Sequence, residues 1–199
     1  MKTLVRRLAV FFIVVLAVII CSERSIGATP RFKALVLAER GGIHEPFVVA
    51  ALDWLNTYSK EKNFKFTVIN HANEIDEALL SKYQVIIQLN YAPYNWGDKA
   101  MAAFVKYIEQ GQGGWVGLHH ASLLGEFDGF QMWDWFSEFM GDISYKNYIA
   151  AKASSTVNIE DKNNPVMKGV PASFVIPDDE WYTYNVSPRP NVHVIATVD

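Results

Sequence analysis

Two adjacent histidines, His119 and His120, are the residues of this 199-residue chain best suited to chemistry. They directly follow the apolar segment 115–118, which two glycines precede. A strand that ends in a tight turn into a helix exposes the first side chain of that turn, beside backbone N–H groups that attract anions. We expect His119 to be that side chain, as a general acid or base or a metal ligand, and His120 to contact substrate. The alternative is a histidine that only satisfies hydrogen bonds of the turn.

A third histidine and a carboxylate, His44 and Glu180, are expected to share this site. His44 lies in the loop that follows the apolar segment 33–38, and Glu180 closes the acidic run 178–180. With His119 they would transfer protons as a catalytic group, or bind a divalent metal such as zinc. Because the three residues lie on separate loops, no local motif specifies a metal, and the cofactor stays open. The alternative for the acidic run is a solvated turn.

Aromatic and amide side chains near the ends of predicted strands indicate a small-molecule carbohydrate as ligand. The residues expected to bind it beside His120 are Asn90, Tyr91, Trp181 and Tyr182. Sugars offer apolar C–H faces to aromatic rings, and hydroxyl groups to amides, imidazoles and carboxylates. Packing in the core or at its rim is the alternative for such rings.

Short apolar segments alternate with helical patterns from residue 33 to about residue 120. Strands are expected at 33–38, 65–70, 84–89 and 115–118, and helices at 45–60, 75–80 and 98–110. This order predicts right-handed βαβ units and a mostly parallel sheet in an α/β protein. Because ligands bind at the carboxyl ends of parallel strands, His44, Asn90 and His119 should meet at one rim.

The pattern is less regular after residue 127. A helix at 132–140 and strands at 156–159, 173–176 and 193–198 are expected. The chain stops in or just after the last of these strands, with no closing helix. We therefore expect the natural protein to be longer, which would make residues 29–199 a C-terminally truncated domain.

Residues 1–28 have the organisation of a signal peptide. Basic residues precede an unbroken apolar run, and small residues at 25–28 suit signal peptidase. We expect residues 29–199 to form one exported domain, periplasmic or secreted. Cys21 directly follows the apolar run, so the alternatives are removal with the leader and lipidation, which would make the protein a lipoprotein.

Composition limits the partners of the mature domain. With a formal net charge of −3 and no basic run after the leader, nothing favours binding to nucleic acid. Contact with a membrane is expected only through the leader or a lipid on Cys21, the one cysteine. The mature domain therefore has no thiol nucleophile of its own. Its oligomeric state is not indicated.

Four blocks of the sequence carry a family resemblance. They are Gly41-Gly42-x-His44; Tyr107-Ile108 with Gly111, Gly113-Gly114 and Val116-Gly117-Leu118-His119; Trp133 with Phe139-Met140-Gly141; and Asp179-Glu180-Trp181-Tyr182. Over about residues 32–199 the chain resembles the ThuA-like family, named for trehalose utilisation, within the class I glutamine amidotransferase-like superfamily. The resemblance implies a flavodoxin-like three-layer α/β/α sandwich. It also implies a role in carbohydrate breakdown, including that of oxidised (3-keto) disaccharides.

The resemblance places His119 where glutamine amidotransferases keep their cysteine, so thiolate-dependent glutaminase chemistry is excluded by residue type. Two departures from the family pattern concern histidines. The segment 141–147 has none, and the later His-Pro is replaced by Asn164-Pro165. Three hypotheses remain open: a hydrolase or isomerase of a glycoside, 3-keto or not, that uses histidine; a non-catalytic carbohydrate-binding module; and a complex-forming subunit.

Overall fold

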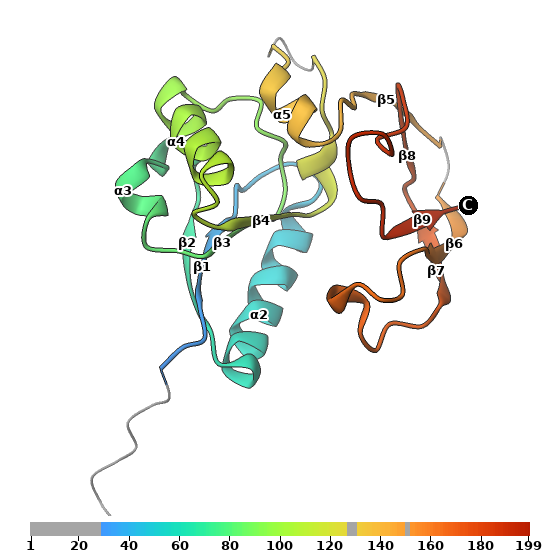
Figure 1. The fold of residues 1–199 in the computed structure, drawn as a ribbon, viewed down its shortest axis with the longest axis horizontal. Helices are drawn as coiled ribbons and strands as arrows, with labels where there is room; N and C mark the ends of the chain where they lie inside the picture. Colours follow the sequence, from blue (N-terminus) through green and yellow to red (C-terminus); the bar gives the residue numbers. More distant parts are fainter. Residues whose placement is uncertain (1–28, 127–130, 150–151) are drawn as a thin grey trace, which may run out of the picture.

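The structure is a computed structural model that describes residues 29–126, 131–149 and 152–199 (Figure 1). The predicted signal peptide, residues 1–28 with Cys21, lies outside the described residues. In the described part of the chain, none of the helices has both the length and the apolar character that a membrane span requires.

Four parallel strands form the central sheet, in the order β2-β1-β3-β4. They are β1 (Lys33–Leu37), β2 (Lys65–Ile69), β3 (Val85–Gln88) and β4 (Gly114–Gly117). All four lie within one residue of the ends expected from the sequence. The order 2-1-3-4 is that of a flavodoxin-like, doubly wound sheet, and it brings the carboxyl ends of β1, β3 and β4 to one rim. The expected parallel sheet and α/β class are confirmed.

Helices cover both faces of this sheet. On one face, α2 (Glu45–Lys62) packs Val48 and Leu55 against Val36 of β1. On the other face lie α3 (Glu77–Leu80), α4 (Asp98–Glu109) and α5 (Asp134–Phe139), which share a core with the β1 residues Leu35 and Leu37. Because side chains alternate along a strand, β1 contributes to both cores. The flavodoxin-like three-layer α/β/α sandwich is therefore confirmed.

The helix expected at 45–60 runs two residues further. It ends at Lys62, and the C-cap residue Asn63 adopts a left-handed conformation with φ 53° that closes the last turn. The helix expected at 132–140 is shorter, because Trp133 still has extended backbone and the helix begins at Asp134. The largest aromatic cluster of the core surrounds Phe104 of α4, which is fully buried.

The C-terminal part of the chain forms two small antiparallel sheets beside the parallel one (Figure 1). One pairs β5 (Tyr145–Tyr148) with β8 (Tyr182–Tyr184), and the other has the order β7-β6-β9. The latter strands are β6 (Ala153–Ile159), β7 (Ser173–Asp179) and β9 (Ala196–Val198). The strand expected at 193–198 begins only at Ala196. Just before it, the Ile195 carbonyl oxygen accepts from the backbone N–H groups of Glu160 and Asp161, and the His193 ring contacts the Asp161 carboxylate.

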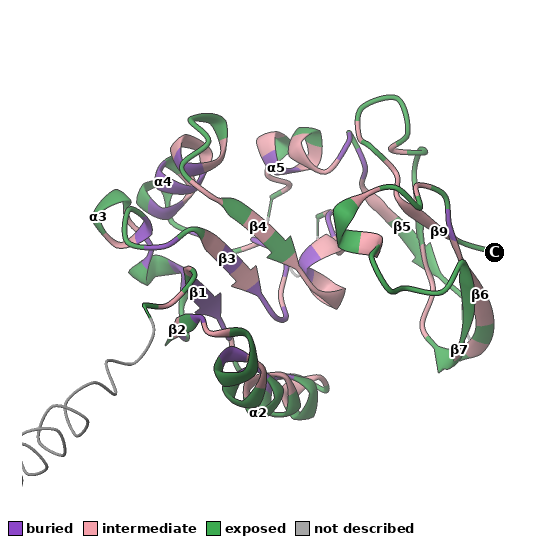
Figure 2. Cartoon of the chain, turned by 60° about the horizontal axis from the view of Figure 1, so that its bottom comes forward, coloured by how far each residue is buried: buried purple, intermediate pink, exposed green. Residues whose placement is uncertain are grey.

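Burial differs sharply across the parallel sheet. Figure 2 shows β1 as the buried centre, whereas β4 at the edge is a mixture of intermediate and exposed residues. The 3₁₀ helix η2 (His119–Ser122) follows this edge strand directly. The turn that carries the two adjacent histidines therefore lies at an accessible corner of the sheet.

Candidate functional site

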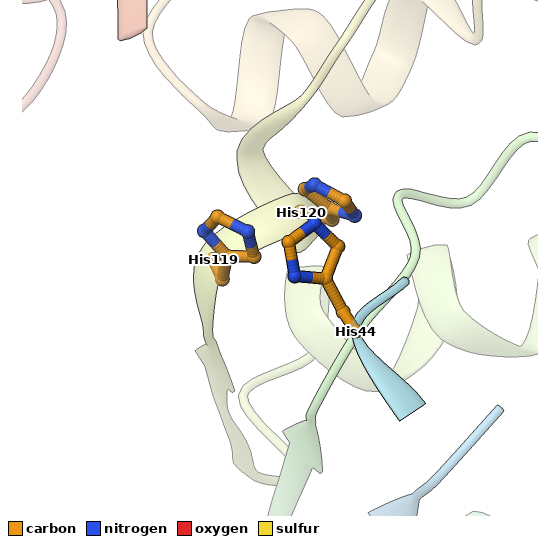
Figure 3. A group of neighbouring side chains, drawn as sticks. All are labelled: His44, His119 and His120. Atoms are coloured by element: carbon orange, nitrogen blue, oxygen red, sulfur yellow. The ribbon is translucent and has the colours of Figure 1, made fainter. Parts of the chain in front are cut away.

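Three histidine rings from two distant parts of the sequence meet at the carboxyl rim of the parallel sheet (Figure 3). The His44 ring centroid lies 4.6 Å from that of His119 and 4.2 Å from that of His120, and both contacts are edge-on. The rings of His119 and His120 stack at 4.2 Å with an interplanar angle of 20°. One ring nitrogen from each residue lies within 4.8 Å of the others. We call these residues the three-histidine cluster.

The turn after β4 determines how two consecutive histidines reach the same cluster. Leu118 still has extended backbone, whereas His119 adopts φ 50°, in the left-handed region, and begins η2. A non-glycine residue in that region costs on the order of 1–3 kcal/mol and is held there by its surroundings. The Ser122 hydroxyl donates to the His119 carbonyl oxygen at 3.0 Å, which closes the turn. This is the sharp strand-to-helix turn that the sequence analysis expected at this point.

The strand that leads into this turn is fixed by a glycine and an indole. A Cβ atom at Gly117 would lie only 2.0 Å from the Trp115 ring, so only glycine leaves room for that ring. The Trp115 indole N–H in turn donates to the Gln88 side-chain oxygen at 3.0 Å, and Gln88 is fully buried in β3. The Gly-Trp-Val-Gly sequence of β4 thus fixes the backbone position just before His119.

A glycine turn between β1 and α2 brings His44 to the cluster. Gly41 and Gly42 have φ values of +113° and +68°, which favour glycine. The Glu45 carboxylate accepts from the Gly41 backbone N–H at 2.6 Å and pairs with Arg40 at 2.9 Å. His44 occupies the N-cap position of α2, and its carbonyl oxygen accepts the first backbone hydrogen bonds of that helix.

Tyr182 joins the cluster from the C-terminal part of the chain. Its hydroxyl oxygen lies 3.4 Å from Nε2 of His119, and the two rings stack at 5.6 Å. The neighbouring Tyr184 hydroxyl donates to the Ser122 hydroxyl at 2.9 Å. Strand β8 is therefore tied to the η2 turn at two points, and Tyr182 forms one wall of the site.

Burial keeps two of the imidazoles neutral. It lowers the pKa of His119 below the usual 6.5, and nearby His44 lowers it further. It lowers the pKa of His120 to about 4, with added effects of His119 and His44. At pH 7 each of these two rings therefore keeps one nitrogen lone pair free to accept a proton or to bind a cation.

The acidic run acts on the cluster by charge and not as a member of it. Glu180 and Asp179 both oppose the lowering of the His119 pKa, so their charges lie close enough to stabilise a protonated His119. Among the residues that the structure describes, the group of side chains that could share a cation consists of His44, His119 and His120, and neither carboxylate belongs to it. The group expected to bind a metal was His44, His119 and Glu180, whereas in the structure the third member is His120.

Burial of Tyr182 and the charge of Glu180 also raise the pKa of the Tyr182 phenol well above its usual value of 10.0. The hydroxyl is therefore protonated throughout the neutral range, and it can donate a hydrogen bond to an anionic oxygen.

The two residues expected after β3 differ in their access to the site. The Tyr91 ring lies 6.5 Å from the His120 ring, and its hydroxyl lies 2.7 Å from where a Gly42 side chain would begin. Asn90 is only 1% exposed, and its amide N–H donates to the Glu39 carbonyl oxygen at 3.3 Å. Tyr91 thus borders the cluster, whereas Asn90 joins the ends of β1 and β3 beneath it.

Trp181, expected to bind substrate, uses its polar group within the chain. Its indole N–H donates to the Ala153 carbonyl oxygen of β6 at 2.7 Å, and the residue is half-buried. The indole therefore links β8 to the neighbouring antiparallel sheet. Tyr182, the next residue, is the one that contacts the cluster.

Two features of the rim were not predicted from the sequence. The Ser122–Tyr184 contact joins residues that no local motif connects. Glu39, directly after β1, is partly buried, and burial raises the pKa of its carboxyl to about 7. Its place soon after a buried parallel strand marks Glu39 in the sequence as a polar residue of this rim, but the burial that raises its pKa is visible only in the structure.

The arrangement combines proton acceptors, a proton donor and nearby negative charge. Neutral His119 can accept a proton, Tyr182 can donate a hydrogen bond, and Glu180 favours the protonated imidazole that results. The same three imidazoles present nitrogen donors that suit a borderline metal ion.

Comparisons with known proteins agree with the fold and extend over nearly the whole described chain. Residues 33–199 match the family described as ThuA, trehalose utilisation. The crystal structure of a ThuA-like protein from Bacteroides uniformis ATCC 8492 has a TM-score of 0.77 at 29% identity, covering 89% of this chain and 71% of that chain.

A second crystal structure, of a ThuA-like protein from Parabacteroides merdae ATCC 43184, has a TM-score of 0.57 at 17% identity. The match covers 77% of this chain and 63% of that chain, and at this identity it supports the fold alone. No curated protein matches the chain.

Proposed function

Because the chain belongs to the ThuA family, described as acting in trehalose utilisation, we propose that it processes a sugar or glycoside with His119 as the acid/base group. The observation that carries the proposal is the convergence of the three-histidine cluster and Tyr182 at the rim of the sheet. Ligand sites of doubly wound sheets lie at this rim.

The composition of the site favours isomerisation over conventional glycoside hydrolysis. Conventional glycosidases place two carboxyl groups on opposite sides of the scissile bond. Here the two carboxylates that act on His119, Asp179 and Glu180, are consecutive in the chain, and the facing groups are imidazoles. A neutral imidazole beside a protonated phenol suits proton transfer at a carbon next to a ketone.

In the proposed reaction, His119 removes the proton from a hydroxyl-bearing carbon adjacent to the keto group of an oxidised glycoside. The C–H electron pair forms the C=C bond of an enediolate, and the carbonyl oxygen takes the negative charge. The Tyr182 hydroxyl donates a hydrogen bond to that oxygen. Return of the proton to the former carbonyl carbon, with transfer of the hydroxyl proton between the two oxygens, gives the isomeric keto sugar.

The remaining residues take supporting parts in this proposal. His44 and His120 complete the catalytic pocket around His119, and Glu180 stabilises its protonated form. Tyr91 and Tyr182 are suited to stacking on the apolar face of a sugar. Asn90 and Trp181 hold the backbone around the pocket, and any contact of theirs with substrate is secondary.

The alternative is a carbohydrate-binding or complex-forming module that kept the fold and lost the reaction. Asn147 and Asn164, where the ThuA family pattern has histidines, favour this alternative. Asn164 caps the short helix η3 (Pro165–Met167), a structural use that needs no ligand.

We also propose that the protein acts outside the cytoplasm. The basic start, apolar run and small residues of positions 1–28 support cleavage by signal peptidase. Lipidation of Cys21 is the alternative processing route. Intact mass of the protein recovered from the producing cell distinguishes a chain that starts near residue 29 from a lipidated one that starts at Cys21.

The test is incubation of the purified protein with trehalose and, separately, with 3-keto-trehalose. Products are analysed by NMR and reducing-sugar assay, and binding by the shift in melting temperature. An isomerase converts the keto sugar without change of mass, whereas a hydrolase releases monosaccharides. Conversion should disappear in His119→Gln while the sugar-dependent thermal shift remains. A thermal shift without any product favours the binding module. The absence of both a thermal shift and a product would contradict a carbohydrate function.

A further inference from the structure

We propose that His44, His119 and His120 bind one divalent transition-metal ion of the zinc class, with a fourth coordination position open to water or substrate. The inference concerns the site of the proposed function and rests on it in one respect, since the metal would lie where the sugar carbonyl is proposed to react. A chain in which His119 binds the ion and a chain in which His119 is the base are two forms of this site, because a coordinated imidazole has no lone pair for a proton. The metal site itself follows from the geometry of the three side chains.

The donor atoms already lie close to a coordinating arrangement. One ring nitrogen of each histidine lies within 4.8 Å of the other two. Zinc–nitrogen bonds of 2.0–2.1 Å in a tetrahedral site separate the donor atoms by about 3.3 Å. The most distant pair must therefore close by at most about 1.5 Å, which rotations about the side-chain bonds can provide.

The cluster lacks the partners that structural histidines normally have. In the described part of the chain, no hydrogen bond reaches a ring nitrogen of His44 or His120, although both rings are partly buried. Histidines that only stabilise a fold usually have such a partner within the protein. Instead, one ring nitrogen of each of the three imidazoles lies within 4.8 Å of the other two, close enough for a single cation to be shared.

The surroundings have the features of a second coordination shell. Metal-binding histidines usually donate their second ring N–H to an oxygen, which fixes the ring. Nε2 of His119 lies 3.4 Å from the Tyr182 hydroxyl oxygen, which leaves Nδ1 for a metal. Asp179 and Glu180 supply negative charge near His119 without being ligands, and this charge favours a bound cation.

The donor set also selects the metal. Three imidazole nitrogens suit zinc, copper, nickel or iron, and do not suit calcium or magnesium, which prefer oxygen ligands. A site with three protein ligands and one open position is the catalytic form of zinc site, whereas structural sites have four protein ligands. In the metal-bound form such an ion would polarise the keto oxygen, and His119 would serve as a ligand and not as the base.

The test measures metal binding independently of any reaction. The purified protein is stripped with EDTA, exchanged into chelator-free buffer, and titrated with Zn²⁺ in competition with a chromophoric chelator. Elemental analysis after gel filtration counts the bound zinc. We expect one Zn²⁺ per chain, no competition by Ca²⁺ or Mg²⁺, and visible absorption of a four-coordinate site when Co²⁺ replaces Zn²⁺.

Variants locate the site. His120→Gln should weaken Zn²⁺ binding by at least about 100-fold, because even loss of a second-shell partner costs about 10–100-fold. His193→Gln is the matched control, since His193 is an exposed histidine paired with Asp161 away from the cluster. Melting temperatures of the zinc-free proteins verify folding. Failure of the wild-type protein to retain zinc overturns the inference, as does undiminished binding in the double variant His44→Gln/His120→Gln.

Sugar conversion in the same samples separates this inference from the proposed function. Conversion of 3-keto-trehalose that needs His119, in a protein that retains no zinc, overturns the metal site and leaves the proposed function standing. Zinc bound through the three histidines, with no conversion of keto sugars by either the zinc-bound or the zinc-free protein, supports the metal site and contradicts the proposed function.

Discussion

The Tyr182 hydroxyl oxygen lies 3.4 Å from Nε2 of His119, although the two residues are 63 positions apart in the sequence. His119 belongs to the turn that leaves the parallel sheet, and Tyr182 to a small antiparallel sheet that follows it. The second anchor, between Tyr184 and Ser122, holds β8 against that turn. The C-terminal strands therefore complete a site that the parallel sheet begins.

Removal of the Tyr182 hydroxyl tests whether it acts in the reaction. Tyr182→Phe keeps the ring and loses the hydrogen-bond donor, so kcat for the keto sugar should fall about 100-fold, the effect of losing one donor to an anionic oxygen. KM and the melting temperature should change little, because the 3.4 Å contact to His119 is long. Steady-state kinetics measure kcat and KM, and a thermal melt measures the melting temperature.

The matched control is Tyr148→Phe, in which an exposed tyrosine of the neighbouring strand β5 loses the same group. Its kcat should equal that of the wild type. Equal kcat values for both variants would show that the Tyr182 hydroxyl takes no part in the reaction.

The glycine turn before His44 should be intolerant of any side chain. A Cβ at Gly42 would lie 2.7 Å from the Tyr91 hydroxyl, in a backbone of φ +68°. Gly42→Ala should therefore lower the free energy of unfolding by about 2–3 kcal/mol, from backbone strain and overpacking together. Urea denaturation measures this change.

Two further variants separate the two causes. Gly169→Ala has φ +85° and no atom within 4 Å of the new methyl group, so it should lose only the strain, about 1–2 kcal/mol. In Gly42→Ala/Tyr91→Phe the hydroxyl is gone, and part of the lost stability should return. A double variant as unstable as Gly42→Ala alone would contradict the described packing of Tyr91 on this turn.

Much of the parallel sheet could be predicted from the sequence, because strands such as β1 are continuous apolar runs and α4 has a clear apolar stripe. The C-terminal strands were harder, since β7 is mostly exposed and lacks a buried face. Their pairing depends on contacts distant in the sequence, such as that of Ala153 with Asp179. Local periodicity contains no information on such pairings.

The site was predictable to the same extent as the sheet. Because the loops after β1 and β4 share one rim, His44 and His119 could be expected together. The inclusion of His120 depends on the left-handed backbone of His119, which stacks the two consecutive rings, and no propensity specifies that. Whether Glu180 or Tyr182 reaches His119 depends on the position of β8, which is set by the Tyr184–Ser122 contact.

Acid should destabilise the protein through His120. Its pKa is about 4 in the folded protein and 6.5 in an ordinary histidine, so between these pH values the unfolded chain binds more protons. The stability is fully present above pH 6.5 and is lost as pH falls toward 4. Urea midpoints between pH 7 and pH 4 should show this fall, and His120→Gln should flatten it. An equally steep fall in the variant would assign the effect to other groups.

A rise in pH from the acidic to the neutral range should destabilise the protein through Glu39. Burial raises the pKa of its carboxyl from 4.5 to about 7, so between these values the folded protein binds more protons than the unfolded chain. Stability is therefore lost as pH rises from 4.5 through 7. Glu39→Gln should be more stable than the wild type at pH 8 and not at pH 4, by urea denaturation. The exposed Glu61→Gln on α2 serves as control, and the same gain there would refute the assignment to Glu39.

The central claim is that His119 transfers a proton to and from a carbon of a keto sugar. It is tested most directly by ¹H NMR of 3-keto-trehalose in D₂O, with wild-type protein and with folded His119→Gln. We predict deuterium at the carbon beside the ketone, at a rate well above that in buffer and lowered about 100-fold or more in the variant. Exchange at the buffer rate with the wild type, or equal exchange with both proteins, would contradict this role of His119.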